Sequence, residues 1–391
     1  MSAKKILLIS EIFPPINGGS GRWFWELYSR LPANEFCVLA GESVHADEFD
    51  KTHHMQVHRF NMSIKQWADW GILNWTGIKF YWRLIRKILH LVESENIGAI
   101  HCGRCIPEGV AAYIVAKLKG IPYLCFVHGE DVTNAARSRE FTWMVNKALK
   151  SSSKLICNSQ NSKNVLMKDW GCPESQIEVL NPGVDTNKFI PAEYNREIRN
   201  KFNWQDRPVI LTVSRLEERK GHDMLIRALD IVKAHHPDVL YAIIGGGDRR
   251  TYLEDLVESL KLSDHVMFMS ELSDEQMIEC YQQCDIFALP NRTIGLNIEG
   301  FGMVLVEAQS CAKPVIGGNS GGTPETMIIG ETGFVIDCTE PTKLATKLVE
   351  LLNNRMNLPS IGQKGREHVV NTLDWQAHAQ KAQVIFKSLN P

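Results

Sequence analysis

The fold of this chain is indicated most clearly by Glu299-Gly-Phe-Gly-Met-Val-Leu-Val-Glu307. Gly300 and Gly302 allow the backbone to turn tightly there and to approach a ligand closely. From Met303 to Cys311 the residues favour a helix, apart from two valines. Proline limits continuation of that helix, and Pro314-Val-Ile316 is typical of a buried strand. The sequence therefore predicts a loop, a helix and a strand in succession.

A helix that begins at a glycine loop suits a phosphate group, because its first N–H groups are unpaired and that end of its dipole is positive. Glu307 lies about one turn inside the helix, where its carboxylate can reach a ribose beside the phosphate. Glu299 lies before the helix, where a sugar would bind. Either glutamate alone could be a solvated surface residue. Two glutamates that bracket Gly-Phe-Gly, with the glycine-rich loop Gly317 to Gly322 after them, indicate a site that binds hydroxyl groups.

Size and charge limit the functions that the chain can have. With 391 residues it is long enough for two domains, each with its own core. A net charge of -2 argues against a general nucleic-acid binder, which is usually strongly basic. No apolar run is long enough to span a bilayer. The short apolar run from Lys5 to Ser10 is better explained as a first buried strand than as a signal peptide.

The ten cysteines are scattered, mostly in apolar contexts such as those of Cys125, Cys157 and Cys311. This pattern is typical of reduced core residues in a cytosolic protein. Cys102 and Cys105 form one C-x-x-C pair without a second, so we expect neither a zinc site nor a thioredoxin-like redox site. We expect a cytoplasmic protein, at the inner face of the cytoplasmic membrane if its acceptor is a lipid.

The E-x7-E stretch resembles the motif of retaining glycosyltransferases of family 4, which have the GT-B fold. The likeness covers most of the chain and is densest from Leu211 to Phe334. Further matches in that range are Ser214-Arg-Leu216, Arg219-Lys-Gly221, Ile244-Gly-Gly-Gly247, Pro290-Asn-Arg-Thr293 and Gly321-Gly-Thr-Pro-Glu325. Within the family the chain is most similar to the phosphatidylinositol mannoside mannosyltransferases, which use GDP-mannose. The resemblance implies an α/β chain of two doubly wound, Rossmann-like domains that face each other across a cleft.

Alternating strand and helix patterns agree with that architecture. The segments of the first half that look like buried parallel strands are Lys5–Ser10, Cys37–Ala40, Ala99–His101, Tyr123–Val127 and Lys154–Asn158. The turn Asn181-Pro-Gly-Val-Asp185 marks the expected switch between domains. By resemblance, residues 1–183 and 375–391 form an N-terminal acceptor-binding domain, onto which the last helix, Trp375 to Leu389, crosses back. Residues 184–374 form a C-terminal domain that binds the nucleotide sugar.

In the N-terminal domain, the loop Phe13 to Arg22 lies between a strand and a helix expected from about Trp23. This geometry suits a phosphate, although a plain turn would have the same pattern. The resemblance implies that Gly18 and Gly19 in this loop reach toward the donor diphosphate. His128 follows a buried parallel strand, where α/β domains bind ligands, and it matches the family's histidine near the donor sugar. Glu130 and Asp131 are further candidates for contacts with the acceptor.

In the C-terminal domain, Arg215 and Lys220 follow the strand Val209–Val213 and could neutralise a diphosphate. The alternative is a solvated charged loop, and the family match favours the diphosphate. Arg219 is assigned to the surface. The loop Ser270 to Asp274, which includes Leu272, would carry the base pocket through its backbone. The remaining expected donor contacts are Glu299, Phe301, Gly302, Met303, Val304 and Glu307.

The segment Trp67 to Leu91 is rich in aromatic and basic residues. Its candidates for peripheral contact with an anionic membrane are Trp67, Trp70, Trp75, Trp82, Arg83, Arg86 and Lys87. Such residues on an amphipathic helix suit a membrane interface. They fit equally well a helix whose tryptophans pack onto the domain while its basic residues form the wet face.

The resemblance implies a retaining transfer of a hexose, mannose from GDP-mannose, to a lipid-linked or glycan acceptor. Departure of the nucleoside diphosphate builds negative charge, which Arg215, Lys220 and the N–H groups near Gly302 and Met303 would stabilise. Neither a divalent metal nor another cofactor is then required, and the chain has no D-x-D element. In this family the leaving phosphate takes the acceptor proton on the same face of the sugar.

Three alternatives remain open. A UDP-sugar could replace GDP-mannose, because the E-x7-E frame serves both donors. A sugar-nucleotide epimerase or hydrolase can share the two-domain fold. A nucleotide-sugar binder without activity is the third, and the presence of Glu299, Glu307, Arg215, Lys220 and His128 argues against it.

Overall fold

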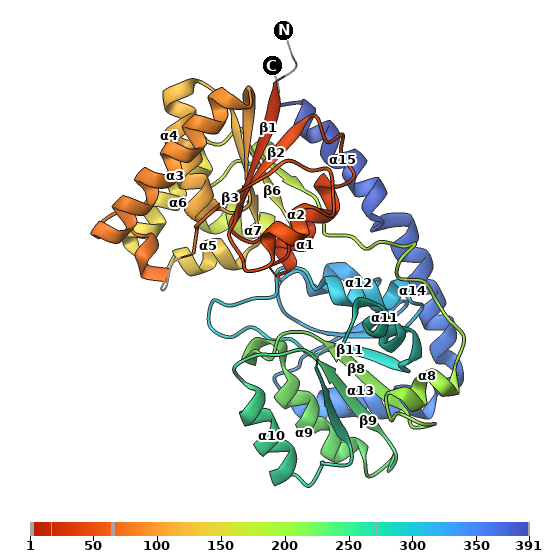
Figure 1. Cartoon of the computed structure of the whole chain (residues 1–391). Coiled ribbons are helices and arrows are strands. Elements are labelled where there is room, and N and C mark those ends of the chain that lie inside the picture. The colour runs from red at the N-terminus through yellow and green to blue at the C-terminus, as the bar shows by residue number, and fades with distance from the viewer. Residues whose placement is uncertain (1–3, 17, 64–66, 271, 390–391) are drawn as a thin grey trace. The chain divides into compact units, whose positions relative to one another are not determined.

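The computed structural model describes residues 4–16, 18–63, 67–270 and 272–389. The chain folds into two compact units (Figure 1). The first unit consists of Met1–Pro182 and Trp375–Pro391, and the second of Gly183–Asp374.

The first unit is built on a seven-stranded parallel sheet with the strand order β3-β2-β1-β4-β5-β6-β7. Its strands are β1 Lys5–Ser10, β2 Phe36–Gly41, β3 Val57–Phe60, β4 Ile97–Cys102, β5 Tyr123–Val127, β6 Lys154–Cys157 and β7 Ile177–Val179. The edge strands β3 and β7 were not predicted from the sequence. They are short and mostly half-buried, so they lack the continuous apolar run that marks the central strands.

Helices cover both faces of this sheet. They are α1 Gly19–Tyr28, α2 Ala46–Asp50, α3 Trp75–Ser94, α4 Val110–Lys119, α5 Glu130–Ala135, α6 Arg139–Ser151, α7 Gln160–Asp169 and α15 Trp375–Lys387, with short turns at η1 Trp67–Trp70, η2 Cys105–Gly109 and η3 Glu174–Gln176. Alternate residues of a strand face opposite sides, and β5 follows this rule. Cys125 lies in the core formed with α3, α4 and α6, whereas Phe126 contacts Trp23 of α1 at 5.1 Å between ring centroids.

Helix α1 begins at Gly19, earlier than the expected start near Trp23. The preceding Gly18 is extended, and an added Cβ there would lie 2.9 Å from a side-chain carbon of Ile12. At Gly21, inside the helix, a Cβ would lie 2.9 Å from the Ile12 carbonyl oxygen. The helix can therefore begin early because small residues let its first turn pack closely against the segment after β1.

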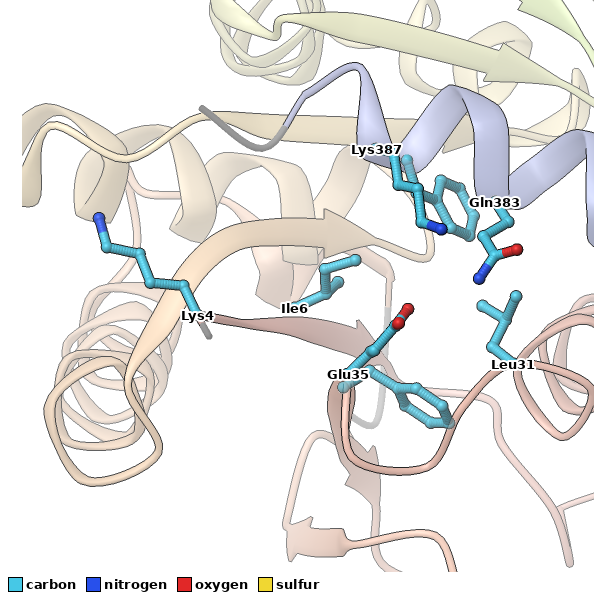
Figure 2. A pocket seen from close by; sticks show the side chains of 8 residues that line it. Lys4, Ile6, Leu31, Glu35, Gln383 and Lys387 are labelled. Atoms are coloured by element: carbon cyan, nitrogen blue, oxygen red, sulfur yellow. The ribbon is translucent and has the colours of Figure 1, made fainter. Parts of the chain in front are cut away.

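The C-terminal helix α15 belongs to the first unit and packs against α1. The ring of Phe386 stacks on Tyr28 at 5.7 Å and lies 4.4 Å from His101 of β4. A small pocket of about 190 Å³ opens beside α15 at the amino ends of β1 and β2 (Figure 2). Lys4, Glu35 and Lys387 are among the residues that line it. Open α/β sheets bind ligands at the carboxyl ends of their strands, so this pocket lies at the opposite end from the predicted site.

The second unit has a six-stranded parallel sheet with the order β10-β9-β8-β11-β12-β13. Its strands are β8 Val209–Val213, β9 Leu240–Ile244, β10 Val266–Met269, β11 Ile286–Leu289, β12 Val315–Gly318 and β13 Gly333–Ile336. Its helices are α8 Arg196–Lys201, η4 Glu218–Lys220, α9 His222–Val232, α10 Arg250–Ser259, α11 Asp274–Gln283, α12 Met303–Ser310, η5 Thr323–Thr326, α13 Pro341–Asn353, η6 Arg355–Asn357 and α14 Leu358–Thr372.

The helices of the second unit also lie on both faces of the sheet, with α11 and α12 on one side and α9 and α10 on the other (Figure 1). Each face has its own apolar core, and neighbouring residues of β8 divide between them: Ile210 lies in one and Leu211 in the other. The strand order reverses between β8 and β11, which makes the loops after these two strands the place where such a fold binds ligands.

All ten cysteines are free and buried. Across residues 4–389, leaving aside the few that the structure does not describe, no helix is both long and apolar enough to cross a membrane. Within the same described part of the chain, no group of three or more His, Cys, Asp or Glu residues is arranged to hold a metal ion.

Candidate active site

In the second unit the strand order reverses between β8 and β11, and the loops after these two strands are locked together at this switch point. The loop after β8 turns into α9 at Gly221, whose φ is +74°. A Cβ added there would lie 1.8 Å from the carbonyl oxygen of Pro290, in the loop after β11. Beside this contact, the N–H of Arg292 donates to the carbonyl of Arg219 at 2.8 Å. Glycine at position 221 is therefore required twice, by the backbone conformation and by the close approach of the second loop.

Glu299 is buried at the centre of this arrangement, only 8% exposed. Its Oε2 accepts hydrogen bonds from Lys220 Nζ and from Arg219 Nη1, each at 2.6 Å. Burial by itself raises the pKa of Glu299, but the two cations outweigh it and hold that pKa below its usual range. Burial lowers the pKa of Lys220, and Glu299 offsets part of that effect. The sequence placed Lys220 and Glu299 at one site, and the structure brings them into direct contact.

Arg219 was wrongly assigned to the surface: it is only 5% exposed and bonded to Glu299. The assignment failed because the short η4 turn directs the side chains of both Arg219 and Lys220 to the same carboxylate. In the sequence, Arg219 stands among charged residues and has no feature that separates it from Arg215. Its position beside the motif lysine was the only available signal.

Arg215 lies at the edge of this cluster, with a side chain that is 65% exposed. Its Nη1 is 2.6 Å from Oε1 of Glu217, and Oε2 of Glu217 is 3.3 Å from Nε of Arg219. Ion pairs therefore connect Arg215, through Glu217 and Arg219, to Glu299 and Lys220. The interpretation as a solvated charged loop fits the exposed Arg215, but it does not fit the buried Lys220.

The backbone of Glu299 is held by the glycine-rich loop after β12. The N–H of Gly322 donates to the Glu299 carbonyl at 2.9 Å, and a Cβ at Gly321 would lie 1.8 Å from that oxygen. Gly321 also has a φ of +56°. This loop therefore contributes to the site by fixing the chain on which the carboxylate is mounted.

Helix α12 begins at Met303, as predicted, with Gly302 before it at a φ of +102°. Gly302 has no side chain with which to cap the helix, so the first N–H groups are available to an anion. The side chain of Phe301 lies in the core with Leu289. Leu272 is half-buried and packs against the same core. Glu271, which precedes it in the predicted base-pocket loop, lies outside the described residues.

Glu307 is also buried, 3% exposed, and its Oε2 accepts a hydrogen bond from the hydroxyl of Tyr281 at 2.7 Å. Since both glutamates of the E-x7-E motif are buried, the solvated-surface interpretation is wrong for each of them. Tyr281, on α11, was not anticipated as part of the site. It lies between Gln282 and Cys280 in a helix with no local motif, so only its contact identifies it.

The stretch Pro290 to Thr293, which matches the family, lies in the loop after β11 and is held by side-chain bonds. Arg292 forms a two-pronged, buried ion pair with Asp223 of α9, with both N···O distances at 2.9 Å. The side chain of Asn291 donates to Thr323 at 2.7 Å and accepts from the N–H of Gly318 at 3.0 Å. These bonds tie the loop after β11 to its neighbours on both sides.

In the first unit, His128 follows β5 and is buried. Its Nε2 donates to the carbonyl of Gly103, at the end of β4, at 2.8 Å, and its ring lies edge-on to Trp23 at 5.4 Å. The N–H of His128 donates to Oδ1 of Asp131 at 3.1 Å. Burial lowers the pKa of His128. Because Nε2 donates to a carbonyl, Nδ1 is the ring nitrogen left to accept a hydrogen bond.

Glu108 lies at the same edge of the sheet and was not anticipated. It is fully buried, and its Oε1 accepts from the N–H of Glu11, the residue after β1, at 2.9 Å. Burial raises the pKa of Glu108 to about 7. This carboxyl group therefore anchors the start of the loop that leads to Gly18 and Gly19.

Two family profiles match the chain. The profile described as glycosyl transferases group 1 matches residues 195–368, and the profile described as glycosyltransferase family 4 matches residues 17–188. The chain is a glycosyltransferase of family 4. The predicted family is thereby confirmed, and the locked loops of the second unit fall inside the first of the two matched ranges.

Two mannosyltransferases are among the relatives of this glycosyltransferase. The GDP-mannose-dependent α-(1-6)-phosphatidylinositol monomannoside mannosyltransferase of Mycolicibacterium smegmatis is 27% identical over 388 residues, covering 96% of each chain. The GDP-mannose-dependent monoacylated α-(1-6)-phosphatidylinositol monomannoside mannosyltransferase of Corynebacterium glutamicum is 29% identical over 398 residues, covering 99% of each.

Solved glycosyltransferase structures share the fold. HepE of Anabaena, in complex with UDP, has a TM-score of 0.83 at 21% identity, covering 98% of this chain and 100% of HepE. WaaG, which is involved in lipopolysaccharide biosynthesis, has a TM-score of 0.72 at 19% identity, covering 97% of this chain and 99% of WaaG. The predicted fold class is confirmed: the glycosyltransferase has two Rossmann-like, parallel-sheet units of the GT-B type.

The residues of the aromatic segment Trp67 to Leu91 do not all fit one interpretation, because some pack onto the domain and others are exposed as a membrane contact would be. Trp70 is only 6% exposed and lies in the core, so its prediction as a membrane contact is wrong. Trp75 and Trp82, on α3, are 70% and 58% exposed, and the guanidinium of Arg86 lies 4.6 Å from the Trp82 ring. The side chain of Trp67 lies outside the part that the structure describes. A tryptophan is thus buried or exposed according to its position on α3 and η1, which residue type alone does not decide.

Proposed function

We propose that this glycosyltransferase transfers mannose from GDP-mannose to a lipid-linked or glycan acceptor with retention of configuration. The observation that carries the proposal is the buried cluster of Glu299, Lys220 and Arg219 at the switch point of the second unit. Such a cluster combines a cation for a diphosphate, Lys220, with a carboxylate for sugar hydroxyls, Glu299. The relatives named for GDP-mannose and for phosphatidylinositol mannosides support this donor and a glycolipid acceptor.

In the proposed reaction, the diphosphate leaves the anomeric carbon and gathers negative charge. Lys220, Arg215 and the first N–H groups of α12, at Met303 and Val304, would stabilise that charge as preorganised donors. Removal of one such donor costs on the order of 10²–10³ in kcat. With these cations in place, we expect no requirement for a divalent metal or for another cofactor.

The remaining proposed roles concern orientation. Glu299 would bind the sugar hydroxyls, and Glu307, held by Tyr281, would bind the ribose. In the first unit, His128 would accept a hydrogen bond from the sugar, and Gly18 and Gly19 would let the backbone approach the diphosphate. The leaving phosphate would take the proton of the acceptor on the same face, which yields retention.

The acceptor side of the proposal includes an anionic membrane. Trp75 and Trp82 are exposed on α3 beside Arg83, Arg86 and Lys87, and aromatic rings next to basic groups suit an interface with acidic head groups. A lipid-linked acceptor would be reached from such a surface. The enzyme would then work at the inner face of the cytoplasmic membrane.

A UDP-sugar is the second candidate donor, because HepE, which shares the fold, has been crystallised with UDP and with UDP-glucose. An epimerase or hydrolase of the same fold is the third alternative. It would consume nucleotide sugar without an acceptor at a rate comparable to its turnover with one.

Thermal melting with GDP, GDP-mannose, UDP and ADP, without added metal, tests the donor. At 100 times Kd, a ligand stabilises by about 2.7 kcal/mol, which raises Tm by roughly 5–10 °C for a domain of this size. We expect GDP and GDP-mannose to stabilise the protein and UDP and ADP to have little effect. Lys220→Gln should reduce the shift by about half or more, whereas Lys364→Gln, at an exposed lysine of α14, should leave it unchanged.

A larger shift with UDP would overturn the proposed donor. Equal shifts in Lys220→Gln and in the wild type would remove Lys220 from the diphosphate site. The absence of a shift with every nucleotide would contradict donor binding altogether.

A further inference from the structure

One oxygen of Glu299 receives two cations. Lys220 Nζ and Arg219 Nη1 each lie 2.6 Å from Oε2. With Arg215 and Glu217, which continue the chain of ion pairs, the cluster holds three cations and two carboxylates. One positive charge is therefore in excess, and an arriving anion can recruit one cation without leaving the cluster negative.

The two cations on Glu299 are held differently. The side chain of Arg219 bonds two carboxylates, since Nη1 donates to Glu299 and Nε lies 3.3 Å from Glu217. Lys220 reaches Glu299 with one ammonium at the end of a flexible stem. A diphosphate that arrives at this edge of the sheet therefore competes for Lys220 more readily than for Arg219.

We propose that Arg219 is a positioning residue, which keeps the carboxylate of Glu299 in place while Lys220 is bonded to the donor diphosphate. The inference rests on the proposed function of the site. If Glu299 had Lys220 as its sole partner, donor binding would leave a buried carboxylate unpaired, which is strongly unfavourable. Arg219 would remain on Oε2 and leave Oε1 for the sugar hydroxyls.

The adjacent residues Arg219 and Lys220 therefore have different roles. Lys220 acts on the diphosphate and therefore on the affinity for nucleotide. Arg219 acts on the sugar through Glu299 and therefore on turnover, with little effect on nucleotide that carries no sugar. Misplacement of a positioning group by about 1 Å can cost on the order of 10² in rate.

The test compares Arg219→Gln, Arg219→Lys and Lys220→Gln with the control Arg227→Gln, at an exposed arginine of α9. The affinity for GDP is measured by calorimetry, and release of GDP from GDP-mannose is followed with water as the acceptor. We expect Arg219→Gln to lower kcat about 100-fold and to change the Kd for GDP by less than about threefold. Lys220→Gln should instead weaken GDP binding by about tenfold or more. The control should match the wild type.

Two further readouts separate positioning from a purely structural role. Arg219→Lys keeps a cation beside Glu299 and should recover much of the lost rate. Because it keeps the charge, this variant also tests the role of Arg219 if the glutamine variant does not fold. Arg219→Gln should also move the acid limb of the pH profile of kcat/KM to higher pH, because that profile reports the free enzyme, in which one of the two cations that lower the pKa of Glu299 is then gone.

The inference is overturned if Arg219→Gln weakens GDP binding as much as Lys220→Gln does, because Arg219 would then be a phosphate ligand. It is also overturned if GDP release is unchanged in Arg219→Gln. If the wild type neither binds GDP nor releases it, the proposed donor is wrong, and the same comparison with UDP and UDP-glucose decides the role of Arg219.

Discussion

The substitution Gly221→Ala addresses the contact that locks the two loops of the site. Gly221 has a φ of +74°, and an added Cβ would lie 1.8 Å from the carbonyl oxygen of Pro290. Gly330, in the same unit, provides a matched control: its φ is +84°, and an added Cβ there meets nothing within 4 Å. Both variants adopt the unfavourable left-handed conformation, and only Gly221→Ala must also separate two backbones.

The left-handed conformation costs an alanine about 1–2 kcal/mol, and this cost applies to both variants. In Gly221→Ala, the loop after β11 must also move by more than about 1 Å to reach an ordinary contact distance. That movement breaks the bond from Arg292 to Arg219, which is worth about 0.5–1.5 kcal/mol, and strains the pairing of Glu299 with Lys220. We expect a total loss of about 3 kcal/mol or more. For a unit of this size, Tm falls by roughly 2–4 °C for each kcal/mol.

Calorimetric melting of both variants, with and without GDP, measures these effects. Gly221→Ala should lower Tm by roughly 6–12 °C and Gly330→Ala by roughly 2–8 °C. Gly221→Ala should also lose the stabilisation by GDP, which Gly330→Ala should keep. Equal melting temperatures together with equal GDP shifts would refute the locked-loop geometry and, with it, the assignment of the site to these loops.

Three other predictions concern Tyr281, His101 and the tryptophans of α3 and η1. Tyr281→Phe removes a buried bond to Glu307 and should cost about 1.5–3 kcal/mol in urea unfolding; an unchanged midpoint would mean that the hydroxyl does not hold the carboxylate. Burial lowers the pKa of His101 to about 3, so below pH 6.5 the unfolded state binds a proton that the folded state does not. The free energy of unfolding should therefore fall by about 1.4 kcal/mol for each pH unit from 6.5 toward 3. His101→Gln should flatten that slope, and an unaltered slope would assign it to other groups. Trp82→Ser should reduce binding to anionic vesicles without changing Tm, whereas Trp70→Ser should cost about 3–5 kcal/mol; equal vesicle binding by wild type and Trp82→Ser would remove α3 from the proposed membrane surface.

The candidate site could be predicted in its parts but not in its connections. Lys220 and Glu299 were each identified from local motifs that follow buried strands. They are 79 residues apart in the chain and meet because β8 and β11 are neighbours in the sheet. Arg219 was missed because a single short turn decides whether its side chain points to water or to Glu299. Tyr281 was missed for a similar reason, since its partner lies on another helix.

The sequence by itself determined the type of most elements, the alternation of buried parallel strands with helices, and the glycines at which the backbone must turn. These features depend on neighbouring residues, through the period of apolar side chains and the stereochemistry of the backbone. Only the tertiary structure decided the order of the strands, the burial of Trp70 against the exposure of Trp82, and the sharing of one Glu299 oxygen by two cations. Burial and ion pairing depend on residues from distant parts of the chain, and those become neighbours only when the sheet has formed.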